Sequence, residues 1–183
     1  MPGLEEFSPK GMLHKGWSAQ VDDYAIVCGW ALKGKAFLVG DVAGGLYPFE
    51  GNSGKLIWQT KEIHKGGLLA MSIHPDGNTF ATAGQDGKVL IWESKEGKST
   101  NTLELGKGWV EHIKWSPDGK FLAVVFTKYV YVFNEKGQEH WKSEEHPSTV
   151  SAIAWSNSNE LATACYGQVT FFDVVNDKIN QKL

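Results

Sequence analysis

Residues 68–93 decide the fold, and they read LLAMSIHPDGNTFATAGQDGKVLIWE. The stretch holds three runs rich in apolar and β-branched residues, at 68–73, 79–83 and 88–92. Between these runs stand Pro75-Asp76-Gly77 and residues 84–87, which are dominated by turn-forming residues. Short runs separated by such turns are strand and hairpin signals rather than helix signals. The stretch therefore predicts three antiparallel strands joined by tight turns.

The same pattern recurs along the chain at nearly constant spacing. Corresponding landmarks follow one another at intervals of 43, 42 and 40 residues: Trp30, Ile73, Trp115 and Trp155. A period in this range is typical of repeat proteins, in which each unit is too small to bury its own apolar face and stacks on its neighbours. The expected strands are 24–30, 36–39, 46–49 and 55–58, then 68–73, 79–83, 88–92 and 99–103, then 110–115, 121–125, 129–133 and 138–141, and finally 150–155, 161–165, 169–172 and 178–181. Four antiparallel strands per unit, stacked radially, predict an all-β propeller.

One part of the second unit resembles a known family. Residues 80–93, FATAGQDGKVLIWE, are similar to the line LASGSxDGxVxIWD of the WD-repeat β-propellers, with Glu93 where that family usually has aspartate. The resemblance extends over roughly residues 12–183. It implies four four-stranded antiparallel blades of WD-repeat type, at about 20–62, 63–104, 105–144 and 145–183.

The resemblance also implies a structural role for four polar side chains. In such blades a histidine, a serine or threonine, an aspartate and a tryptophan form a buried hydrogen-bond chain that ties the strands together. His64, Thr82, Asp86 and Trp92 stand at the matching positions of the second unit. We therefore expect the second blade to be the most firmly held.

The other units depart from this set. The fourth keeps His146 and Thr163 but lacks the aspartate and ends in Phe172 where the tryptophan would stand. The third has neither the histidine nor the aspartate, and the first has Ala43 in the aspartate position. Blade stability is therefore expected to be uneven.

Residues 1–19 form an N-terminal segment with a predicted outer strand at 12–17. Trp17 stands 13 residues before Trp30, much as Trp58 and Trp141 precede the landmarks of their following units. Residues 12–17 therefore read as the outer strand of a blade that precedes the first one. Because four blades rarely close a ring, two expectations remain open. The chain is the N-terminal part of a propeller of seven or eight blades, or two copies associate into an eight-bladed ring.

Composition excludes several function classes. The net charge is −3, and none of the 18 basic residues is arginine, the usual reader of phosphates and guanine edges. Nucleic acid is therefore an unlikely partner. Cys28 and Cys165 are far apart and belong to no C-x-x-C pair, so reduced thiols in a cytoplasmic protein are the simpler interpretation. No run of 18 apolar residues is present, and we expect no membrane span.

No motif of enzyme chemistry is found, so no catalytic residue, metal or cofactor is predicted. P-loop, G-x-S-x-G and H-E-x-x-H patterns are missing from the sequence. The densest histidine cluster is residues 140–146, where adjacent ligands on a strand would point to opposite faces. A solvated loop, with His146 recruited to blade structure, is the favoured interpretation of this cluster. A metal site is the alternative.

Trp109 is the best candidate for contact with a partner. It precedes Trp115 by six residues, and the equivalent positions hold Tyr24, Gly67 and Thr149, so no packing rule demands an aromatic residue. In WD-repeat proteins this position commonly faces the narrow surface where partners bind, and G-protein β subunits carry a Trp-Val pair at the same distance from the turn. The predicted partner-binding residues are Trp109, Glu111, Tyr24, Leu69, Lys128 and Tyr166. Local packing of Trp109 over a blade edge is the alternative.

Two functions remain open. The first is a non-catalytic scaffold that presents this surface to protein or peptide partners. The second is an enzyme, or a propeller that binds a small ligand or metal at its central channel. That alternative requires several ionisable side chains to converge there, and only Glu111 and His112 stand near the starts of the inner strands.

Overall fold

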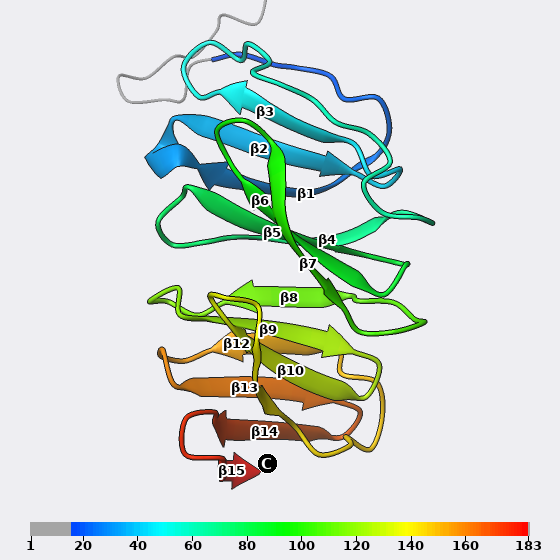
Figure 1. Ribbon diagram of the computed structural model, residues 1–183, viewed down its shortest axis with the longest axis vertical. Coiled ribbons are helices and arrows are strands. Elements are labelled where there is room, and N and C mark those ends of the chain that lie inside the picture. Colours follow the sequence, from blue (N-terminus) through cyan, green and yellow to red (C-terminus); the bar gives the residue numbers. More distant parts are fainter. Residues whose placement is uncertain (1–15, 183) are drawn as a thin grey trace, which may run out of the picture.

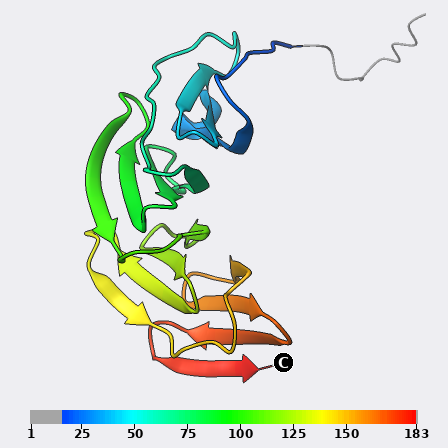
Figure 2. The same cartoon turned by 90° about the vertical axis from the view of Figure 1, so that its right-hand side faces the viewer.

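Four antiparallel sheets stand side by side along an open arc (Figures 1 and 2) in the computed structural model, which describes residues 16–182. We number the sheets as blades in chain order. The second blade contains β4 (Leu68–Ile73), β5 (Thr79–Gly84), β6 (Lys88–Glu93) and β7 (Lys98–Glu104). The third contains β8 (His112–Trp115), β9 (Phe121–Phe126), β10 (Tyr129–Asn134) and β11 (Glu139–Lys142). The fourth contains β12 (Ala152–Trp155), β13 (Glu160–Cys165), β14 (Gln168–Asp173) and β15 (Lys178–Lys182).

The first blade contains three continuous strands, β1 (Ala25–Ala31), β2 (Ala36–Asp41) and β3 (Leu46–Glu50), and a short 3₁₀ turn (Leu32–Gly34) follows β1. The fourth strand expected at 55–58 is reduced to two isolated bridges, Leu46 with Thr60 and Phe49 with Leu56. Pro48 lies between these bridges in β3, and it has no backbone N–H to donate to a ladder. The outer edge of this blade is therefore irregular.

The first strands of the blades, β1, β4, β8 and β12, line the concave side of the arc (Figure 2). In the second and third blades the middle strands are buried on both faces, because a blade packs on each side: the neighbouring residues Phe80 and Ala81, and likewise Leu122 and Ala123, are all at most 1% exposed. In the fourth blade burial alternates along β13, from Leu161 at 0% to the half-buried Ala162. One face of the fourth blade is thus left open.

A side-chain N–H on the outer edge of one blade fastens it to the hairpin of the next. Trp58 Nε1 donates to Ser94 O at 3.2 Å, and Trp141 Nε1 donates to Asp177 Oδ1 at 2.6 Å. Asn101 occupies the same register position in β7, and its Nδ2 lies 3.5 Å from Lys136 O. Each bond joins positions about one repeat apart, so these contacts hold the blades in sequence.

Trp17 makes the same kind of contact with the first blade. Its Nε1 donates to Gly51 O at 2.7 Å, and its ring packs against Phe37 and Phe49 with centroids 6.4 and 5.9 Å away. The predicted strand at 12–17 lies almost wholly outside the described residues. Trp17 itself stands where the outer edge of a preceding blade would place a tryptophan.

Candidate functional site

Four polar side chains of the second blade form one continuous hydrogen-bond chain. His64 Nδ1 is 3.0 Å from Asp86 Oδ1, and His64 Nε2 is 3.0 Å from Thr82 Oγ1. Trp92 Nε1 lies 2.9 Å from the same Thr82 oxygen. Three parts of the blade supply these groups: the loop before β4, strands β5 and β6, and the turn between them. This hydrogen-bond chain therefore ties the loop before β4 to the sheet.

Donor and acceptor rules fix the direction of this chain. Trp92 can only donate, so the Thr82 oxygen accepts from it. The Asp86 carboxylate can only accept, so His64 Nδ1 carries the proton, and Nε2 of the neutral ring accepts from the Thr82 hydroxyl. His64 Nδ1–H is then the donor to Asp86, which also accepts from the backbone N–H of Lys65 at 3.2 Å. Burial lowers the pKa of His64, with Asp86 opposing the shift only in part, so the imidazole is neutral at neutral pH.

The other blades hold their strands differently. In the fourth, His146 Nε2 meets Thr163 Oγ1 at 2.9 Å, but Phe172 has no N–H to extend the chain. In the first, Asp41 accepts from Tyr47 Oη at 2.8 Å and from Gly45 N at 2.7 Å. Burial and this carboxylate raise the pKa of Tyr47 to about 12, which keeps the phenol protonated. The Asp41–Tyr47 pair had no motif that could have predicted it.

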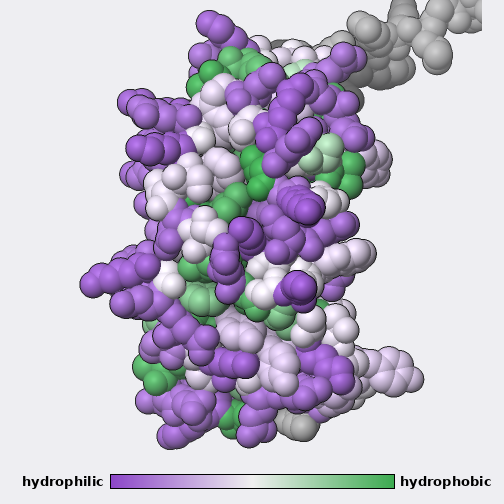
Figure 3. Space-filling model, turned by 45° about the vertical axis from the view of Figure 1, so that its right-hand side comes forward, coloured by the Kyte–Doolittle hydropathy of each residue, from purple (hydrophilic) through white to green (hydrophobic). Residues whose placement is uncertain are grey.

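Two kinds of segment form the face of the arc that lies at one end of all the strands, which we call the loop surface. The loops before β4, β8 and β12 lie there, together with the β2–β3, β5–β6, β9–β10 and β13–β14 hairpins, because antiparallel strands reverse at each turn. Leu68, Val110 and Val150 anchor the loops: each is 0% exposed, and each donates its N–H to the hairpin of the preceding blade at 3.1 or 3.2 Å. Backbone hydrogen bonds between neighbouring blades therefore hold the loop surface together. It faces the viewer in Figure 2 and is seen obliquely in Figure 3.

Trp109 precedes the buried anchor Val110, and neighbouring side chains in extended backbone point in opposite directions. Its side chain is 53% exposed. Within residues 16–182, no hydrogen bond or ring contact holds the Trp109 indole. The loop that carries it contains Gly106 and Gly108 at φ values of 122° and 153°, which favour glycine. The structure thus leaves a large apolar side chain half exposed, with no hydrogen-bond or ring partner among residues 16–182.

The other predicted surface residues divide into two groups. Tyr24 and Tyr166 are 75% and 91% exposed at the same end of the blades as Trp109. Lys128 is also there, but its Nζ is paired with Glu145 Oε1 at 3.1 Å. Leu69 and Glu111 instead line a hollow of about 580 Å³ between β4 and β8 on the concave side.

The two histidines of the 140–146 segment have separate surroundings in the structure. His140 stacks on Phe121 with ring centroids 4.6 Å apart, whereas His146 is buried against Thr163. Within the described part of the chain, no three His, Cys, Asp or Glu side chains are grouped to hold a metal. Across residues 16–182, no helix is long and apolar enough to cross a membrane.

Comparison with known proteins identifies the repeat. The profile of the family described as WD domain, G-beta repeat, matches residues 56–93 and 97–134. The chain contains two WD repeats. Each matched span begins at the outer edge of one blade and ends with the third strand of the next, so each WD repeat bridges two blades.

Curated relatives carry similar repeats within longer chains. The p21-activated protein kinase-interacting protein 1-like of Gallus gallus is 34% identical over 85 residues, covering 42% of this chain and 23% of that protein. The small ribosomal subunit protein RACK1 of Candida albicans is 33% identical over 115 residues, covering 56% and 35%. The ribosome biogenesis protein erb1 of Botryotinia fuckeliana is 29% identical over 110 residues, covering 58% and 13%. The chain thus spans about a third or less of the length of these relatives.

A solved structure shares the fold. A chain in the crystal structure of a mitotic checkpoint complex superposes with a TM-score of 0.79 at 18% sequence identity. The match covers 90% of this chain and 52% of the other. The propeller fold therefore extends over most of the chain, beyond the residues that the family profile matches.

Proposed function

We propose that this WD-repeat chain is a protein-interaction scaffold that binds a protein or peptide through the loop surface carrying Trp109. The observation that carries the proposal is the half-exposed Trp109, which has no hydrogen-bond or ring partner within residues 16–182 and stands beside the fully buried Val110. Tryptophan on a rigid surface is a typical interface hot spot, because it contributes a large contact area at little cost in conformational entropy. Tyr24 and Tyr166 add two further exposed aromatic side chains at the same end. Relatives named for a kinase-interacting protein and a ribosomal subunit protein are consistent with such a role.

A site-specific photo-crosslinker tests this proposal. Benzoylphenylalanine at position 109 is expected to capture one or a few defined proteins in cells. The matched control is the same group at position 30, because Trp30 is also 53% exposed but lies near the opposite end of β1. Equal capture at both positions, or none at 109, contradicts the proposal. Trp109→Ala should weaken the binding of the captured protein in a pull-down, while changing stability by less than about 0.5 kcal/mol.

We further propose that the open face of the fourth blade packs against another WD-type blade. Ala162, Ala164 and Val169 on this face are half-buried, whereas Ala83 and Val89, at matching register positions of the second blade, are 0% exposed. A blade packed there would bury an apolar surface of the kind that the inner junctions already bury.

Additional blades suit the structure better than a ring of two copies. In such a ring the fourth blade of one copy, with β15 as its outer strand, would face the first blade of the other. The Gly51 carbonyl, where that outer strand would fasten, already accepts from Trp17. Light scattering on the purified chain should therefore show no clean dimer. A stable species of twice 20.2 kDa would favour the two-copy ring instead.

A further inference from the structure

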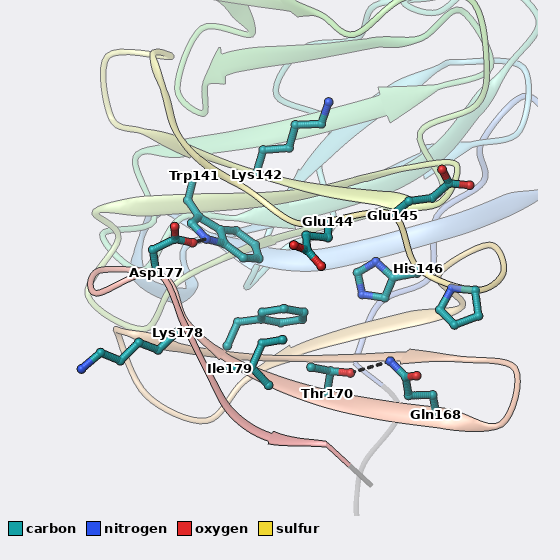
Figure 4. Close-up of a pocket in the computed structure, with 12 residues that line it drawn as sticks. Trp141, Lys142, Glu144, Glu145, His146, Gln168, Thr170, Asp177, Lys178 and Ile179 are labelled. Carbon is teal, nitrogen blue, oxygen red and sulfur yellow. Dashed lines mark hydrogen bonds between the residues drawn. The ribbon is translucent and has the colours of Figure 1, made fainter.

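A cavity of about 380 Å³ lies at the junction between the third and fourth blades. Figure 4 shows it between β11 with the loop that follows and the pair β14–β15. Trp141 and Phe172 form its aromatic part, with ring centroids 5.0 Å apart. Both blades that enclose the cavity are described in full around it, so it does not depend on what completes the arc.

The aromatic part of the equivalent junction between the first and second blades is filled, and the hollow of about 360 Å³ found there lies outside it, beside Glu62 and His64. There Trp58, Ile63 and Leu90 pack against the buried Phe80 and Trp92 in one apolar cluster. The register shows which residues correspond: Leu90 pairs with Thr82, and Trp92 pairs with Phe80. This junction is a packed core.

Smaller or more polar side chains stand at the corresponding positions of the third and fourth blades. Thr170 pairs with Thr163 and so replaces Leu90, while the pair Phe172–Leu161 replaces Trp92–Phe80. The residue before His146 is Glu145, where Ile63 precedes His64. Each exchange removes apolar volume from the junction. The cavity is therefore encoded by these substitutions.

The polar groups that face the cavity are mainly hydrogen-bond acceptors. The Glu144 carboxylate turns into it (Figure 4), and within residues 16–182 this side chain has no hydrogen bond or ion pair. Thr170 is 2% exposed and accepts from Gln168 Nε2 at 2.8 Å, which leaves the Gln168 carbonyl oxygen to accept another bond. Asp177 adds a second carboxylate, which accepts from Trp141 Nε1.

The nearby lysines do not neutralise this region. Lys142 and Lys178 both point away from the cavity in Figure 4. The Lys142 ammonium lies over the rings of Tyr129 and Tyr131, 4.6 and 4.9 Å from their centroids. The third carboxylate of the lining, Glu145, is already bound to Lys128 and Tyr129. The carboxylate charges at the cavity that no lysine pairs with are therefore those of Glu144 and Asp177.

We propose that this cavity binds a small organic cation, an ammonium or methylated ammonium group on a short apolar stem. Aromatic rings attract such a cation through their quadrupole, and a desolvated aromatic site strengthens that attraction. Glu144 supplies the opposite charge, and the Gln168 carbonyl supplies an acceptor. The volume suits one such group together with its stem. This site is distinct from the Trp109 surface and does not depend on it.

Calorimetric titration with choline and with its neutral isostere 3,3-dimethylbutan-1-ol tests the proposal on the intact chain. Choline is expected to bind at least about tenfold more tightly than the alcohol, because only the cation gains from the aromatic rings and from Glu144. The indole N–H signal of Trp141 should shift with choline. Equal affinity for the two probes, or no binding of choline, overturns the proposal.

Two variants locate the binding. Thr170→Leu places the leucine of the filled junction into the cavity, and it should abolish choline binding while preserving the fold. Glu144→Gln should weaken choline binding about threefold without affecting the alcohol. Glu135→Gln, an exposed carboxylate in the β10–β11 hairpin, is the matched control and should leave binding unchanged. Retained affinity in both cavity variants would place the binding elsewhere and overturn the proposal.

A peptide pair separates the two sources of such a cation. Acetyl-Ala-Lys-Ala-amide and its norleucine counterpart differ only in the ammonium group. Preference for the lysine peptide over choline would identify the source as a side chain of a protein. Preference for choline would identify it as a free small molecule, and both results require the cation to be recognised.

Discussion

The second and fourth blades share a histidine and a threonine but differ in what surrounds them. In the second, His64 and Thr82 are completed by Asp86 and Trp92. In the fourth, the β13–β14 turn is only Tyr166-Gly167, which leaves no place for the aspartate, and Phe172 replaces the tryptophan. Both sequences nevertheless form a four-stranded sheet. Strand pairing and inter-blade packing therefore define the blade, whereas the hydrogen-bond chain adds local stability.

Truncation of the central apolar residue should give the largest contrast between the two blades. Phe80→Ala removes a ring that lies between Trp58 and Trp92 and should cost about 4 kcal/mol, whereas Leu161→Ala at the matching position should cost about 2.5 kcal/mol. Urea denaturation of the two variants measures the difference. Equal losses would show that the two junctions are equally well packed.

Removal of Asp86 should have the next largest effect. Asp86→Ala leaves the buried His64 Nδ1–H without an acceptor and should lower the free energy of unfolding by about 2 kcal/mol. Glu96→Ala, an exposed carboxylate in the β6–β7 turn of the same blade, is the control and should cost less than about 0.5 kcal/mol. If Asp86→Ala lowers the free energy of unfolding no more than the control does, the hydrogen-bond chain does not stabilise the blade.

Acid should weaken the second blade by a smaller amount. The pKa of His64 is held below its ordinary value of 6.5, so below about pH 6.5 the unfolded chain takes up a proton that the folded chain does not. Stability should therefore fall as the pH drops through this value, until the folded histidine is protonated as well. The His64→Gln variant should be less stable at pH 7 and should show a flatter slope between pH 7 and 5. The same slope in both proteins would exclude His64 as the cause.

Restoring the tryptophan of the fourth blade should have the smallest effect, and its sign is opposite. Phe172→Trp can donate to Thr163 Oγ1, as Trp92 does to Thr82, and should stabilise the chain by about 0.5–1 kcal/mol. Phe133→Trp in the third blade is the matched control, because Val124 stands where the acceptor would be and no gain is expected. Equal gains in both variants would attribute the effect to added apolar area alone.

Most strand positions were predictable because their signals are local. The expected run at 68–73 coincides with β4, and those at 79–83, 121–125 and 129–133 differ from β5, β9 and β10 by one residue. The prediction of a continuous fourth strand at 55–58 in the first blade was wrong, because Pro48 interrupts β3, the strand it would pair with. The hollow that Leu69 and Glu111 line could not be predicted, because it depends on how β4 and β8 meet across two blades.

The sequence by itself determined the repeat, the strand class and the positions of the turns, because glycine, proline, aspartate and alternating apolar residues act over a few neighbours. Only the tertiary structure decided which side chains meet across a whole repeat. It placed Trp141 against Asp177, left the Trp109 side chain half exposed, and opened the cavity beside Thr170. The physical reason is that a blade has two faces, and its packing depends on the volumes that both neighbours bring to each junction.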